Sequence, residues 1–176
     1  MKYPSIFYIL MLLAFSCGKD DPTYFEEKIP ENCESGTCDF NYSDNSQIQI
    51  EVEYFGRLGQ VVEGENLVFK YLYQYDDQPS IADDELTTEL VFEIPGDKNN
   101  FTISEEDFVN NKVLYRMICF CGNVSHEFPS CGSITGIRLS PNSWRVNASL
   151  TIDYYAELDA DFDPIEIEFN TVFARE

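Results

Sequence analysis

The fold is decided by residues 144–154, Trp-Arg-Val-Asn-Ala-Ser-Leu-Thr-Ile-Asp-Tyr. Apolar side chains occupy every second position of this stretch, and the residues between them are polar. Successive side chains of a β-strand point to opposite faces of a sheet, so this alternation predicts a strand with one buried and one solvated face. The turn signal Pro141-Asn142-Ser143 before it predicts a connection to a strand over Ile134–Leu139.

The same period of two recurs along the chain outside this stretch. Strands are also expected over 46–54, 67–75, 90–94, 101–103, 112–121 and 165–173. The segment 112–121 is the most apolar and is expected to lie centrally in a sheet, while Ser104–Asp107 resembles a capping box and predicts a short helical turn. About eight short strands without a long helical period predict an all-β protein, an antiparallel β-sandwich, for which an immunoglobulin-like arrangement is one alternative.

The N-terminal residues have the pattern of an export signal. A short basic start, Met1-Lys2, is followed by an apolar run over Ile6–Phe15 and the small residue Ser16. The run is about half the roughly 20 residues that a membrane-spanning helix needs. The chain is therefore expected to divide into a signal peptide over 1–16, an acidic tether with a local disulfide over 17–45, and a β-sandwich domain over 46–176.

A family resemblance refines this prediction. The sequence Leu13-Ala14-Phe15-Ser16-Cys17 resembles a bacterial lipoprotein box, and Lys19, Asp20 and Asp21 resemble the export signal of Bacteroidetes surface lipoproteins. The resemblance implies acylation of Cys17, with palmitate among the chains, and anchoring to the bacterial outer membrane. It favours the cell surface, and the periplasmic face is the alternative. Ordinary secretion, with Cys17 in a disulfide bond, is a further alternative.

The charge of the chain limits its partners. The chain carries 32 acidic residues against 11 Lys and Arg, a formal net charge of -21. Such a charge disfavours nucleic acid, whose phosphates are neutralised by Lys and Arg, and it disfavours direct docking on anionic lipids. Membrane contact is therefore expected through the lipid anchor alone.

The cysteines offer two kinds of site. In an oxidising compartment we expect disulfide bonds Cys33–Cys38 and Cys121–Cys131, with Cys119 as a buried thiol. The weaker alternative is a zinc site, because the spacing resembles part of a zinc knuckle. Its ligands would be Cys119, Cys121, His126 and Cys131.

The sequence patterns that support other candidate sites are less specific. His126 is the only histidine, which excludes sites that need two or three histidines, and it is expected to be a solvated loop residue. Asp159, Asp161 and Asp163 alternate as in a calcium loop, so a loose calcium site is an alternative to a solvated acidic turn. The tyrosines over 71–75 form either core or a platform for a sugar ring.

No catalytic motif stands out in this chain. We therefore expect a non-enzymatic, lipid-anchored binding or accessory protein outside the cytoplasm, without a required cofactor and with a protein or glycan ligand that the sequence does not identify. The alternatives are a small carboxylate-dependent glycan hydrolase and a structural subunit of a surface assembly.

Overall fold

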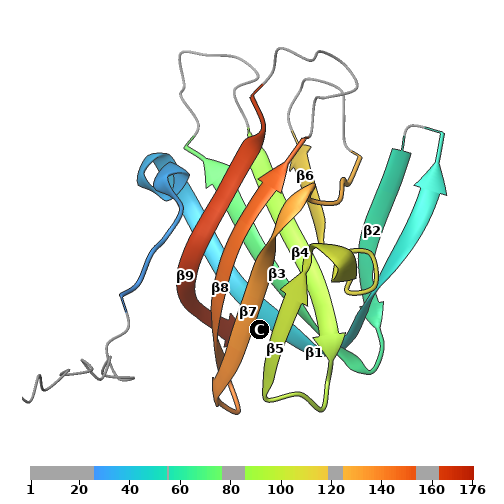
Figure 1. The fold of residues 1–176 in the computed structure, drawn as a ribbon, viewed down its shortest axis with the longest axis vertical. Helices are drawn as coiled ribbons and strands as arrows, with labels where there is room; N and C mark the ends of the chain where they lie inside the picture. The colour runs from blue at the N-terminus through green and yellow to red at the C-terminus, as the bar shows by residue number, and fades with distance from the viewer. Residues whose placement is uncertain (1–25, 55, 77–85, 119–124, 154–162) are drawn as a thin grey trace, which may run out of the picture.

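The computed structural model describes residues 26–54, 56–76, 86–118, 125–153 and 163–176, which form an all-β fold (Figure 1). The described residues contain nine strands and two short 3-10 turns. These elements are η1 (Glu31–Ser35), β1 (Gly36–Glu53), β2 (Gly56–Glu63), β3 (Asn66–Tyr75), β4 (Thr87–Pro95), β5 (Asn100–Ser104), η2 (Glu105–Asp107), β6 (Leu114–Ile118), β7 (Cys131–Ser140), β8 (Ser143–Ile152) and β9 (Ile165–Arg175). The expected all-β class is confirmed, and η2 carries the expected capping box.

Two four-stranded layers face each other across the main core. One has the order β5-β7-β8-β9, the other has the order β1-β3-β4-β6, and β2 pairs with β1. All strand pairs are antiparallel except β1 and β9, which meet in parallel at Asn41–Ala174 and Tyr42–Arg175 and so join the layers. Phe69 of β3 packs edge-on against Trp144 of β8, with ring centroids 5.5 Å apart. The result is a sandwich-like arrangement of two sheets.

The strand predicted over 144–154 is confirmed as β8, which lies between β7 and β9. β8 pairs along its whole length with β9, and with β7 from Ser143 to Thr151. Its inward side chains are fully buried: Trp144, Val146, Ala148, Leu150 and Ile152. Their burial against the aromatic side chains of β3 and β4 supplies the main hydrophobic stabilisation of the fold.

The strand order differs from the immunoglobulin alternative. In immunoglobulin sheets strand B lies beside strand E, which is not its neighbour in sequence. Here the pairs β3–β4, β7–β8 and β8–β9 join consecutive strands, whereas β1–β3, β4–β6 and β5–β7 join strands that are not consecutive in the chain. The chain crosses between the two layers from β4 to β5, from β5 to β6 and from β6 to β7.

A second, smaller core lies on the other face of β3, β4 and β6. β1 bends at Asn45, which has a φ of 51°, and its second half forms a hairpin with β2. This hairpin stands beside the main layers in Figure 1 and buries Ile48 against Val68, Val91 and Leu114. β6 is the last strand of its sheet, so the central position expected for 112–121 is wrong. The second apolar face of β6 packs against the hairpin.

The expected tether over 17–45 is too long. β1 begins at Gly36, and Tyr42 is buried with its ring stacked on Phe69 at a centroid distance of 5.4 Å. The alternation was hidden because polar residues dominate the segment, in which Cys38, Phe40 and Tyr42 pack against the core. Among the described residues no helix has the length and hydrophobicity that a membrane-spanning segment requires.

Candidate functional site

The residues 26–30, here called the strap, lie along the edge of β9. The Lys28 N–H donates to the Asn170 carbonyl (2.9 Å), and the Asn170 N–H donates to the Lys28 carbonyl (2.6 Å). Lys28 Nζ forms an ion pair with Glu168, and the Thr171 hydroxyl donates to Glu27 Oε1 at 2.7 Å. The strap therefore acts as a short antiparallel neighbour of β9.

The strap occupies a gap that the strand pairing leaves open. β1 and β9 pair only near the C-terminal end of β9, at Ala174 and Arg175. Towards Ile165, no strand among the described residues pairs with the edge of β9 that faces away from β8, and buried backbone groups need hydrogen-bond partners. The strap supplies such partners at Asn170.

A cavity of about 500 Å³ lies beneath the strap. One wall consists of Tyr71, Thr88 and Tyr115 from β3, β4 and β6, all buried. The remaining walls come from the strap and the first residues of β9, namely Lys28, Ile29, Pro30, Ile165, Glu166, Ile167 and Glu168. Apolar side chains with a few hydroxyl groups, in a cavity of this size, are typical of small-molecule sites.

The charged side chains that line the cavity lie at its exposed rim, where each has an ion-pair or hydrogen-bond partner. Lys28 and Glu168 are more than half exposed and pair with each other at 2.5 Å. Both oxygens of Glu166 accept hydrogen bonds from the Thr151 hydroxyl at 3.1 Å. The interior of the cavity therefore offers hydroxyl groups and apolar surface, and the charges lie outside.

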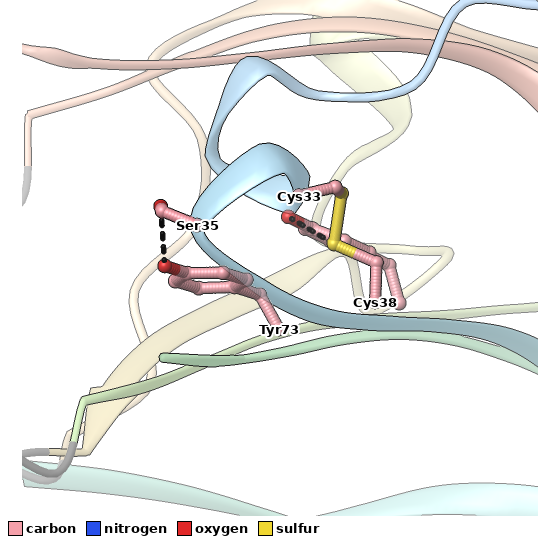
Figure 2. The surroundings of a disulfide bond; sticks show 5 residues. Cys33, Ser35, Cys38 and Tyr73 are labelled. Atoms are coloured by element: carbon pink, nitrogen blue, oxygen red, sulfur yellow. Dashed lines mark hydrogen bonds between the residues drawn. A yellow bond between two sulfur atoms is a disulfide. The ribbon is translucent and has the colours of Figure 1, made fainter. Parts of the chain in front are cut away.

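Figure 2 shows a disulfide bond in the segment that follows the strap. Cys33 and Cys38 are joined, which confirms the predicted local bond between η1 and β1. The Ser35 and Tyr73 hydroxyls lie 3.2 Å apart, and Cys38 Sγ lies 3.9 Å from the Tyr71 hydroxyl. The bond thus fixes the segment that follows the strap against β3.

The tyrosines at positions 71, 73 and 75 belong to the main hydrophobic core. Tyr71 and Tyr73 are buried and Tyr75 is half-buried, so they do not form an exposed platform for a sugar ring. Tyr71 nevertheless lines the cavity. The cavity itself had no local signal in the sequence, because its walls come from the strap and from four strands that are distant along the chain.

His126 is fully buried, so the expectation of a solvated loop histidine is wrong. Its Nδ1 accepts a hydrogen bond from the Gly59 N–H at 3.1 Å, and its Nε2 lies 3.5 Å from Glu89 Oε2. Because Nδ1 is the acceptor, Nε2 carries the proton in this arrangement. The hydrogen bond at Nδ1 therefore holds His126 to β2, while Nε2 faces Glu89 of β4 without a hydrogen-bond partner among the described residues.

Glu89 is charged because its partners outweigh its burial. Burial alone raises the pKa of this carboxyl, but the side chain of His126 and the guanidinium of Arg116 lower it more. Arg116 Nε donates to Glu89 Oε2 at 2.7 Å. The pKa of Glu89 consequently lies below its usual value of 4.5.

The expected zinc and disulfide sites around His126 are not assembled by the described residues. Cys131 is exposed and has a free thiol, which contradicts the predicted bond to Cys121. Cys119 and Cys121 lie outside the described residues. Within the described ranges, no group of three His, Cys, Asp or Glu side chains is placed to hold a metal ion.

The remaining predicted residues are mostly outside the structural description. Cys17, Lys19, Asp20 and Asp21 precede the first described residue. Of the calcium candidates, Asp163 is exposed just before β9, whereas Asp159 and Asp161 lie outside the described ranges.

Comparisons with known proteins give no relative for this chain. No protein-family model, curated protein or solved structure matches it. A function can therefore be inferred only from the geometry of this molecule and from its sequence signals.

Proposed function

We propose that this chain is a lipid-anchored binding protein outside the cytoplasm, which holds a small ligand in the cavity beneath the strap. The observation that carries the proposal is this cavity of about 500 Å³, in which the buried residues Tyr71, Thr88 and Tyr115 face the strap. Its residues are suited to binding rather than to acid–base catalysis, because the rim carboxylates of Glu166 and Glu168 already have partners.

The chemistry of the walls favours an uncharged ligand with an apolar face. Burying hydrocarbon against apolar side chains such as Ile29 and Ile167 is favourable. The Thr88 hydroxyl can orient a polar group of the ligand. The net charge of -21 disfavours a strongly anionic ligand. A sugar ring or a short glycan fragment has both an apolar face and hydroxyl groups, and it fits this description.

The proposed anchor would keep the cavity close to the membrane. Glu26 follows Cys17 by nine positions, a length that spans about 30 Å at most when extended. Acylation of Cys17 would add more than one lipid chain, which is the requirement for stable membrane attachment. The strap would then lie between the anchor and the ligand site.

The proposal that the cavity binds a ligand is tested with a variant whose larger side chain fills the cavity. Mature wild-type protein and the variants Ile167→Trp and Thr88→Val are screened by thermal unfolding against a panel of neutral mono- and oligosaccharides. Val172→Trp is the matched control, because Val172 lies on the outer face of the same strand and does not line the cavity.

The expected result is a sugar that raises the melting temperature of wild type and Val172→Trp but has a much smaller effect on Ile167→Trp. Thr88→Val preserves the volume of the side chain, so it reports on the loss of the hydroxyl group even if the tryptophan variant folds poorly. A panel without effect on wild type, or an equal effect on Ile167→Trp, would contradict the proposal.

A further inference from the structure

A second hollow lies at the other end of β9 from the cavity. Its volume is about 530 Å³, and it is open to solvent. It is formed where the turn between β7 and β8, the turn between β4 and β5 and the end of β9 meet, and its lining residues are Asn99, Arg138, Leu139, Ser140, Pro141 and Arg175. Backbone hydrogen bonds fix this end of the fold, because the Arg138 N–H donates to Asn99 (2.9 Å) and the Arg175 N–H donates to Asn142 (3.1 Å).

Arg138 has an unusual environment for a cation in so acidic a chain. Most other cations of the described residues have a carboxylate partner, as do Lys28, Arg57, Lys70, Lys112, Arg116 and Arg175. Arg138 forms no ion pair with any residue in the part of the chain that the structure describes. Its guanidinium instead lies over the Trp144 ring, 5.3 Å from the centroid.

Each of the two side chains in this contact has a buried N–H donor without an acceptor among the described residues. Arg138 Nε and Trp144 Nε1 are both inaccessible to solvent, and neither has a hydrogen-bond partner among the described residues. Both groups can only donate. Because both nitrogens are closed to solvent, a ligand in the hollow would reach Arg138 through the remaining N–H groups of its guanidinium.

We propose that this hollow binds a small molecule through a carboxylate group. The Arg138 guanidinium would donate to the carboxylate from one side and that of Arg175 from the other, in the forked geometry that guanidinium and carboxylate groups share. Arg175 Nη2 already donates to Asp44, but a guanidinium has five N–H donors, and the rest of the fork is not used by that bond. Leu139 and Pro141 add apolar surface for the body of the ligand.

The charge of the whole chain restricts the ligand to a small anion. A net charge of -21 repels polyanions, and two arginines cannot compensate for many phosphate or sulfate groups. A single carboxylate on a compact, partly apolar body, such as a uronic acid, meets both conditions.

The chain contains its own reporter for this site, because Trp144 is its only tryptophan and contacts the Arg138 guanidinium. The fluorescence of mature protein is titrated with glucuronate, and glucose is the uncharged control. Arg175→Gln removes one side of the site but keeps the pair of Arg138 and Trp144. Arg57→Gln removes the same charge from the remote β2 hairpin and is the matched control.

The proposal predicts a saturable fluorescence change with glucuronate and none with glucose. Affinity should fall about tenfold or more in Arg175→Gln and stay unchanged in Arg57→Gln. Calorimetric titration of Arg138→Lys, which keeps the charge but loses the fork, should show a similar loss while its melting temperature shows that it is folded. A non-saturable change, an equal response to glucose, or equal affinity in Arg175→Gln would overturn the proposal.

Discussion

Glu93 is a buried carboxylate whose role is to satisfy the backbone of another strand. Its Oε2 accepts a hydrogen bond from the Ile48 N–H at 2.6 Å, and its Oε1 lies 2.9 Å from Lys112 Nζ. Lys112 Nζ in turn donates to the Ile48 carbonyl at 2.5 Å. Glu93 and Lys112 therefore supply the hydrogen bonds that a neighbouring strand would give to the Ile48 backbone. They also hold the β1–β2 hairpin over the second core.

Removing the Glu93 carboxylate should lower the stability of the fold. In Glu93→Leu the ammonium of Lys112 and the Ile48 N–H lose their partner in a mostly dry environment, so we expect the free energy of unfolding to fall by about 3 kcal/mol. Urea unfolding measures the change, and Glu63→Leu on the exposed side of β2 should stay within about 0.5 kcal/mol of wild type. A loss in Glu93→Leu no larger than that of the control would contradict this role.

Glu89 makes stability depend on pH in a predictable direction. Its pKa in the folded state lies below the usual value of 4.5, so the unfolded state binds more protons in that range. The stabilisation is fully present above the usual pKa, and it is lost as the pH falls through the lower pKa of the folded state.

The substitution Glu89→Gln isolates this contribution from the many other acids. The difference in unfolding free energy between wild type and Glu89→Gln should be largest near neutral pH and should shrink as the pH falls below 4.5. Denaturant unfolding across a pH series measures it. A difference that stays constant or grows under acidic conditions would contradict the assigned ion pair with Arg116.

At the level of elements, the sequence predicted those strands in which one face is apolar and the other polar. β8 has an apolar side chain at every second position and was predicted with nearly its observed bounds. The first half of β1 was missed because Thr37, Asp39 and Asn41 are typical of loops, and the strand depends on partners in β3. β6 was expected to be central because its two apolar faces do not show whether a sheet or a hairpin covers them.

The disulfide bond at the start of β1 should stabilise the fold by a modest amount. It closes a loop with a sequence separation of only five residues, for which the loss of chain entropy in the unfolded state gives about 2 kcal/mol. The double variant Cys33→Ala/Cys38→Ala should therefore melt about 4–8 °C below wild type.

Reduction provides the control for this prediction. A reducing agent should lower the melting temperature of wild type to that of the double variant and should leave the double variant unchanged. If the double variant and wild type melt together under oxidising conditions, the bond contributes no stability and the prediction is wrong.

At the level of the whole molecule, the sequence predicted the class of fold but not the candidate site. Tyr71 was recognised as one of a row of tyrosines, yet nothing local connects it with Ile29 or Ile167. Lys28 and Asn170 lie near opposite ends of the described chain and meet only because the last strand returns to the first. Contacts of this kind depend on strand order, which alternating patterns do not encode.

The burial of His126 was hidden from the sequence for the same reason. Its partners are the Gly59 N–H in β2 and Glu89 in β4, and both lie far from it along the chain. A histidine next to a proline-containing segment has the local pattern of a solvated loop. The pairing of Tyr115 with Glu127 and the hydrogen bond from the His126 N–H to the Arg57 carbonyl (2.7 Å) bring the segment under the hairpin.

We propose that a lipid on Cys17 holds this sandwich outside the cytoplasm. The most direct test is the intact mass of the membrane-extracted protein and of its N-terminal peptide, for wild type and Cys17→Ala. We expect wild type to begin at Cys17 and to carry the mass of its acyl chains, and we expect the variant to lack that mass. A wild-type protein that begins at Met1, or that begins elsewhere without acyl chains, would contradict the claim.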